Sequence, residues 1–265
     1  MDAVEITLGI PALEVENLTV LRSGKVILKD IDFKINKGEF VALVGPNGSG
    51  KSTLMLSVLG VLNAQKGNIK IYGNQPMSRN LNGKIGWVSQ AASNLPKEIK
   101  ITVRELVSLG VINATNLFSL HIRDRSDDID NAIKMVGLEG EQNTDVGRLS
   151  GGQRQRAVIA RALASNAEFI MLDEPLVGID RDARNSLLKL LDRLCHQEGK
   201  TILMVSHDLT AMRQTAHRII YLEEGIRYDG HSEKFPDFST LAGLRGIEHV
   251  HDHDLLQPGQ KGEEK

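Results

Sequence analysis

The sequence predicts an α/β protein with a mixed sheet core, an antiparallel β portion at its N-terminus and an inserted helical subdomain. Short apolar runs that alternate with helical patterns predict a sheet that is largely parallel. A glycine-rich loop between an apolar run and a helical pattern supports the same class. Alternating apolar and polar residues near the N-terminus are typical of antiparallel strands with one exposed face.

Composition excludes several classes of protein. With 265 residues, 41% of them hydrophobic and 25% charged, the chain suits a globular protein with one large domain, or with a core and a smaller subdomain. The net charge of −2 implies no bulk attraction to nucleic acid, so we expect no nucleic-acid partner. No run approaches the ~20 apolar residues of a membrane span, and no signal peptide is evident, so we expect a cytoplasmic location.

The first elements follow from periodicity. Residues 13–20 alternate, and residues 40–44 are continuously apolar, as in a strand buried on both faces. A helix is expected over residues 52–62. Residues 26–35 alternate as an exposed-face strand would, with one side carrying Ile27, Lys29, Ile31, Phe33 and Ile35.

The remaining elements set the domain organisation. Strands are expected at residues 69–72, 85–88, 169–172, 201–205 and 218–222. The segment 91–166 lacks strand patterns and is expected to be helical over 103–110, 127–136 and 151–165. We assign residues 1–235 to one domain and 236–265 to a polar tail whose last ~15 residues are expected to be disordered. The single cysteine, Cys195, falls in a leucine-rich helical pattern, which indicates a core-facing position.

The glycine-rich loop carries the most specific chemistry, since residues 45–53 match G-x-x-x-x-G-K-[ST]. Its glycines let backbone N–H groups point at phosphate oxygens, and the following helix adds a favourable dipole. Lys51 is expected to reach the β- and γ-phosphates of a nucleotide, and the Ser52 hydroxyl to bind magnesium. The residues predicted to bind nucleotide are Gly45, Pro46, Asn47, Gly48, Ser49, Gly50, Lys51, Ser52 and Thr53.

Two further motifs lie downstream. Asp173 and Glu174 end an apolar run, where ligands of a parallel sheet gather, so Asp173 is placed to hold magnesium. An acidic turn before Pro175 is the alternative, and it is stronger for Glu174. Ser150 fits as an N-cap, while two glycines after it lower helix propensity and leave N–H groups bare for an anion. The residues of this second motif are Ser150, Gly151, Gly152 and Gln153.

Order and spacing of these three motifs resemble the ATPase subunit of an ABC transporter, over roughly residues 13–230. The resemblance implies a P-loop NTPase fold, ATP and Mg²⁺ as cofactors, and catalytic roles for Lys51, Glu174 and His207. Glu174 would polarise the attacking water, and His207 would act as a switch at the γ-phosphate. The Ser150 motif would bind ATP held by a second copy, in a head-to-tail sandwich of two chains.

The resemblance extends to two more positions and fails at one. Gln90 would contact the metal or water, and Asp180 would contact the opposite copy, although Asp180 also suits a plain helix N-cap. The family usually stacks an aromatic residue on adenine, and here Arg22 stands in its place. A guanidinium plane can stack on a base. Alternatively, Arg22 is a solvated turn residue, and the sequence leaves both possibilities open.

The cargo is indicated by weaker features. Residues 101–110 and 174–180 are most similar to the zinc and manganese importer subfamily. His249, His251 and His253 alternate with carboxylates in the tail and suit zinc, although a solvated polar tail is an equal alternative. We therefore expect import of a transition-metal ion through a separate membrane permease, with an extracytoplasmic solute-binding protein and a peripheral membrane location.

Three alternatives compete with this function. An iron-chelate or cobalamin importer shares every ATP motif. A soluble ABC ATPase that acts on ribosomes or DNA usually has paired domains or a long coiled coil, and neither is seen here. A regulatory module that only binds ATP commonly lacks the catalytic carboxylate or lysine, whereas this chain has both.

Overall fold

The computed structural model describes residues 10–93, 100–112 and 125–236, and it confirms the α/β class with a mixed sheet. The main sheet has six strands in the order β5-β6-β7-β3-β8-β9, and five of them are parallel. β9 pairs antiparallel with β8. The strands are β3 (Phe40–Val44), β5 (Ile85–Val88), β6 (Phe169–Asp173), β7 (Thr201–Val205), β8 (Arg218–Leu222) and β9 (Ile226–His231).

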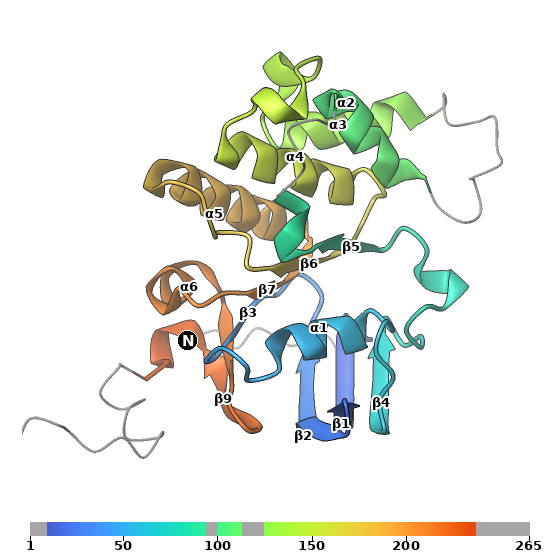
Figure 1. Ribbon diagram of the computed structural model, residues 1–265, viewed down its shortest axis with the longest axis vertical. Helices are drawn as coiled ribbons and strands as arrows, with labels where there is room; N and C mark the ends of the chain where they lie inside the picture. The colour runs from blue at the N-terminus through green and yellow to red at the C-terminus, as the bar shows by residue number, and fades with distance from the viewer. Residues whose placement is uncertain (1–9, 94–99, 113–124, 237–265) are drawn as a thin grey trace, which may run out of the picture.

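An antiparallel sheet of three strands, β2-β1-β4, forms the predicted N-terminal β portion (Figure 1). It contains β1 (Leu13–Arg22), β2 (Lys25–Ile35) and β4 (Lys66–Ile71). The expected one-sided alternation of residues 26–35 is wrong at its start, because Leu28 is buried and Lys29 is exposed. Val20 pairs with Leu28 while Leu18 pairs with Ile31, so β2 has an extra residue there. This bulge, with Asp30 at a φ of 48°, reverses the faces of the strand.

The helix after the glycine-rich loop, α1 (Lys51–Val58), ends four residues earlier than the periodicity predicted. Gly60 adopts a left-handed φ of 75° just beyond it. The Gly60 N–H donates to the Ser57 carbonyl at 3.0 Å, and the Val61 N–H donates to the Leu56 carbonyl at 2.9 Å. This is a Schellman end, for which glycine is the favoured residue, so the stop was present in the sequence.

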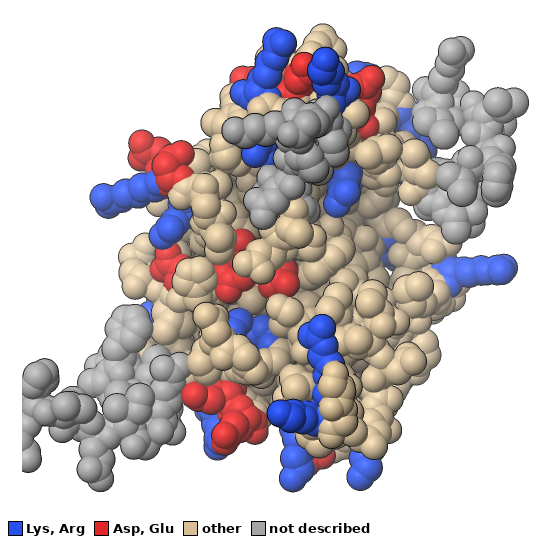
Figure 2. Space-filling view, viewed as in Figure 1, with Lys and Arg blue, Asp and Glu red and all other residues tan. Residues whose placement is uncertain are grey.

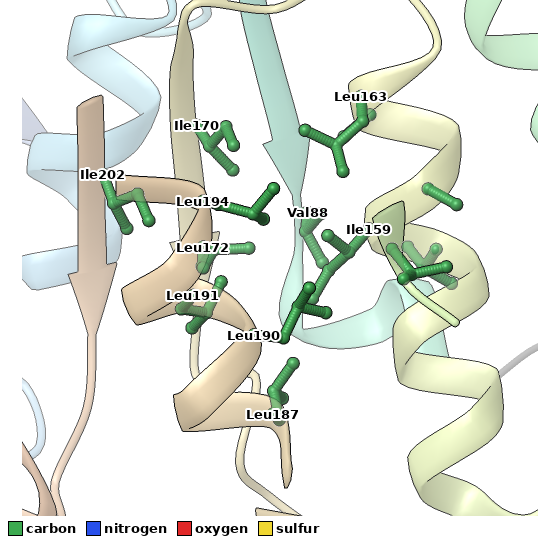
Figure 3. Packing of buried hydrophobic residues seen from close by; sticks show 14 of the residues in the cluster. Val88, Ile159, Leu163, Ile170, Leu172, Leu187, Leu190, Leu191, Leu194 and Ile202 are labelled. Carbon is green, nitrogen blue, oxygen red and sulfur yellow. The ribbon is translucent and has the colours of Figure 1, made fainter. Parts of the chain in front are cut away.

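Both faces of the parallel strands are covered, which explains their continuous apolar runs. On one face, α1 and the antiparallel sheet pack against residues such as Leu43 and Met171. On the other face, residues such as Ile170 and Ile202 pack against α4 (Gly151–Leu163) and α5 (Arg181–His196). Figure 3 shows leucines of α5 interdigitating with Ile159 and Leu163 of α4 and with strand residues between them. The sheet is therefore the middle layer of the molecule.

Two further helices lie together at one end of the molecule in Figure 1, beyond strand β5. They are α2 (Val103–Ser108) and α3 (Ser126–Met135), which pack against α4. A 3-10 turn, Leu109–Val111, continues α2, so all three helices expected in this segment are found within a few residues. α6 (Leu209–Thr215) lies between β7 and β8. Strand β9 was missed, because its residues are only half-buried or exposed and give no apolar run.

The surface and the single thiol give two further observations. No helix in the described ranges is long and apolar enough to cross a membrane. Positive and negative side chains are interspersed on the face shown in Figure 2, so neither sign dominates that face. Cys195 is buried and donates to the Gly38 carbonyl at 3.2 Å, and burial raises the pKa of its thiol to about 11. The prediction of a core-facing cysteine is confirmed, and the raised pKa keeps this thiol protonated and unreactive near neutral pH.

Truncation of one α5 leucine tests this packing. Leu191 is fully buried between α5 and the sheet, so Leu191→Ala is expected to lower the free energy of unfolding by about 2–5 kcal/mol. Val61 is 65% exposed. The control variant Val61→Ala should therefore change the free energy of unfolding by less than about 0.5 kcal/mol. Urea unfolding at equilibrium measures both, and similar losses for the two variants would contradict the described core.

Candidate functional site

The glycine-rich loop forms a tight cradle between β3 and α1. Gly45 has a φ of 151°, and a Cβ there would lie 2.1 Å from the Leu222 carbonyl oxygen. Gly50 has a φ of 97°, and its Cβ would lie 2.7 Å from the Leu28 side chain. Neither position can hold a larger residue without a shift of its neighbours, so packing requires both glycines. A Cβ on Gly48 would meet nothing within 4 Å, so the loop is open at that position to a ligand such as phosphate.

Lys51 lies inside this cradle with only 7% of its surface exposed. Its Nζ donates to the carbonyl oxygens of Gly45 at 3.0 Å and Pro46 at 2.8 Å. Burial lowers the pKa of Lys51, and the carboxylates of Glu174 and Asp173 oppose that change. A buried ammonium with two carbonyl partners is a strong donor for an anion that enters the loop.

A cavity of about 550 Å³ opens over the loop and is lined by eleven of the residues predicted from the sequence. They are Arg22, Asn47, Gly48, Gly50, Lys51, Ser52, Thr53, Gln90, Asp173, Glu174 and His207. Ile27, Val177 and Val205 also line it, and sequence reasoning missed them. Ile27 could have been found, because it follows Arg22 closely across the hairpin between β1 and β2.

Asp173 has the properties of a cation ligand. It is 8% exposed, and its Oδ1 has no hydrogen-bond partner within the described part of the chain. Burial raises the pKa of Asp173, while a hydrogen bond with Ser52 and the charge of Lys51 lower it. An unpaired buried carboxylate oxygen is costly, so the site suits a hard cation held by Asp173, Ser52 and Gln90.

Glu174 and His207 form the second chemical group of the cavity. The Glu174 Oε2 and the His207 Nδ1 lie 2.8 Å apart. Glu174 has a φ of 51°, uncommon for a residue other than glycine, and its N–H donates to the Val205 carbonyl at 3.1 Å. Such backbone strain often persists where a side chain must be aimed at a ligand, and here it directs the carboxylate into the cavity.

The Ser150 segment is built as a capped helix start. The Ser150 hydroxyl accepts from the Gln153 N–H at 3.2 Å, and the Gln153 side chain accepts from the Ser150 N–H at 3.0 Å. A Cβ on Gly152 would lie 2.5 Å from the Ala183 Cβ of α5, so packing explains this glycine. A Cβ on Gly151 would meet nothing closer than 3.5 Å. Packing therefore accounts for Gly152, while Gly151 leaves the N-terminus of α4 bare.

Several predicted residues lie away from the cavity. None of residues 150–153 lines it among the described residues, and neither does Asp180. Asp180 caps α5 by accepting from the Ala183 N–H at 2.9 Å, so the plain N-cap interpretation is confirmed. Gly45, Pro46 and Ser49 belong to the cradle but not to the cavity wall. His249, His251 and His253 lie outside the described residues.

The chain is similar to a known family model and to several known proteins. The family model described as "ABC transporter" matches residues 28–177. The "Zinc uptake system ATP-binding protein ZurA" of Listeria monocytogenes is 37% identical over 85% of this chain and 88% of its own length. The "Manganese transport system ATP-binding protein MntB" of Halalkalibacterium halodurans is 34% identical over 82% of this chain and 84% of its own length.

Solved structures share the fold. The cbiO1 protein from Clostridium perfringens, described as part of the ABC transporter complex cbiONQ, has a TM-score of 0.75 and 30% identity, covering 89% of this chain and 94% of that one. A dimeric post-hydrolysis structure of the ATP-binding cassette MJ0796, bound to ADP and Pi, has a TM-score of 0.66 and 30% identity, covering 84% and 100%.

Proposed function

The chain belongs to the ABC transporter family and is an ATP-hydrolysing, ATP-binding subunit of such a transporter, and we propose that two copies share two ATP sites to drive import of a transition-metal ion. The observation that supports a shared site is that the glycine-rich loop and the Ser150 segment lie apart within one chain. The loop and its neighbouring carboxylates line one cavity, while none of residues 150–153 at the capped start of α4 lines it among the described residues.

A second copy supplies the missing half. The dimer of MJ0796 shows that a cassette of this fold can pair with itself. In the proposed dimer, the N–H groups of Gly151 and Gly152 and the Ser150 hydroxyl bind the γ-phosphate that the other chain holds in its cradle. Asp180, on the adjoining loop, contacts the opposite chain. Each ATP site then needs residues from both copies.

Hydrolysis follows from the residues in the cavity. The Glu174 carboxylate accepts a hydrogen bond from water and orients the water oxygen toward the γ-phosphorus. A bond forms between that oxygen and the phosphorus, and the bond to the β–γ bridging oxygen breaks with its electron pair leaving on ADP. The proton of the water passes to Glu174 and then to the released phosphate. His207, hydrogen-bonded to Glu174, holds the carboxylate in place and contacts the γ-phosphate.

Magnesium fits the remaining groups. Asp173, Ser52 and Gln90 would hold it, because they supply oxygen ligands at the edge of the cradle. When bound, the ion neutralises charge on the β- and γ-phosphates. Lys51 supplies the second positive charge from inside the loop. Arg22 lines the same cavity, which supports the proposal that its guanidinium stacks on the nucleotide base.

The proposed cargo rests on the relatives. Two of them are named for zinc uptake and manganese transport. The chain would act through an integral membrane permease, to which it binds peripherally from the cytoplasmic side. An extracytoplasmic solute-binding protein would deliver the metal ion to that permease.

Uptake in cells tests the cargo. Deletion of the gene is expected to reduce accumulation of zinc or manganese at least several-fold in metal-poor medium, because transport without ATP hydrolysis stops. Return of the wild-type gene should restore uptake, and return of the Glu174→Gln variant should not. Normal accumulation of both metals alongside loss of iron-chelate or cobalamin uptake would contradict the proposal and favour the other importer class.

A further inference from the structure

The first turn of α5 contacts three other parts of the molecule: the loop that precedes it, the start of α4 and the start of α6. Asp180 caps the turn from the loop proposed to face the second copy. Ala183 packs against Gly152 so closely that no Cβ would fit between them. Arg184 is one residue further along, and its Nη1 donates to the Asp208 Oδ2 at 2.7 Å.

Asp208 is held on every side. Its Oδ1 accepts from the Ala211 N–H at 3.0 Å and thereby caps α6. Its own N–H donates to the Ser206 hydroxyl at 3.1 Å. With Arg184 on its second oxygen, Asp208 has a hydrogen-bond partner on both carboxylate oxygens, one in α6 and one in α5.

His207 has few contacts of its own that fix its side chain. Its side chain is 65% exposed, so little packing holds it, and its hydrogen bond within the described residues is to Glu174. It lies between Ser206, which is buried, and Asp208. The two neighbours of His207 are hydrogen-bonded to each other, and Asp208 is also joined to α5 by Arg184.

We propose that Arg184 is a positioning residue for ATP hydrolysis. Through Asp208 it keeps His207 in register with Glu174 and ties this pair to the turn that carries Asp180 and packs on Gly152. If contact with the second copy shifts the first turn of α5, residues 206–208 would then shift with it. The first part rests on the established hydrolysis, and only the coupling to the second copy rests on the proposed shared site.

The ion pair contributes little to folding, because both partners are partly exposed, with side-chain exposures of 40% and 24%. Its loss can therefore be separated from unfolding. Arg184→Ala is expected to lower kcat by about tenfold and to change the KM for ATP by less than about twofold. Asp208→Asn, which keeps the helix cap, should likewise lower kcat and leave the KM for ATP nearly unchanged. Arg184→Lys should retain part of the kcat that Arg184→Ala loses.

The closing experiment combines steady-state ATPase kinetics with thermal unfolding of the full chain. The double variant Arg184→Ala/Asp208→Asn should be no slower than either single variant, since both remove one interaction. Lys189→Ala removes a cation elsewhere on α5 and is the matched control, with wild-type kcat expected. A kcat within twofold of wild type for folded Arg184→Ala would overturn the proposal, as would an equal loss in the Lys189 control.

A dimer assay separates this proposal from the shared site. Glu174→Gln and Glu174→Gln/Arg184→Ala are compared for ATP-induced dimers by size-exclusion chromatography. Dimers of both, with the kinetic loss above, support a positioning role in an intact sandwich. Failure of Glu174→Gln itself to dimerise would count against the shared site, while the kcat result for Arg184 would still decide the positioning role. If Glu174→Gln forms dimers and Glu174→Gln/Arg184→Ala does not, Arg184 acts in dimer assembly, and a purely positioning role is overturned.

Discussion

Glu174→Gln should lower ATP turnover by about 10²–10⁴-fold while ATP still binds. Glutamine retains the size of the carboxylate and a group that can face His207, but it cannot accept the proton of the attacking water. The cradle around Lys51 and the Asp173 oxygen are untouched by this change. The bound ATP then stays intact, and we expect a long-lived dimer because the phosphate continues to hold the Ser150 segment of the second copy.

Turnover, ATP binding and dimer formation are measured separately for this variant. Glu168→Gln is the matched control, because Glu168 is an exposed glutamate that directly precedes the opposite end of β6. It should hydrolyse ATP at the wild-type rate. Turnover of Glu174→Gln within about tenfold of wild type would show that another group orients the water.

Mixing two inactive variants should restore ATPase activity if each site is shared. Lys51→Ala removes the ammonium from the cradle, and Ser150→Arg fills the bare start of α4. A heterodimer of the two has one site with both halves intact and one with neither. An equal mixture should therefore recover roughly a quarter of wild-type turnover, provided that chains exchange freely and one intact site works alone.

The control for this mixture is Lys51→Ala combined with the double variant Lys51→Ala/Ser150→Arg, which contains no intact cradle. It should remain inactive at every ratio. Heterodimers shown to form by differential tagging, but with no activity in the first mixture, would argue against a head-to-tail arrangement in which one copy completes the site of the other.

Local patterns in the sequence predicted most of the helices and strands and most of the residues that line the cavity. The run at 40–44 is a strand buried on both faces, and the loop from Gly45 is a tight glycine turn that leads into α1, because few-residue spacing determines both. Ser150 and Asp180 are the helix caps that their residue types predict. Even the early end of α1 follows from Gly60, a signal that periodicity alone overlooked.

The tertiary structure alone decided what depends on contacts between distant segments. Strand order places β3 between β7 and β8, and so gathers Gln90, Asp173 and His207 around one cradle. The bulge in β2 and the weak strand β9 arise from pairing with neighbours, which no local period encodes. The tie from Arg184 to Asp208 spans 24 residues and two elements. Such a contact is fixed when α5 and β7 pack in the same core, and packing is a property of the whole chain rather than of any segment.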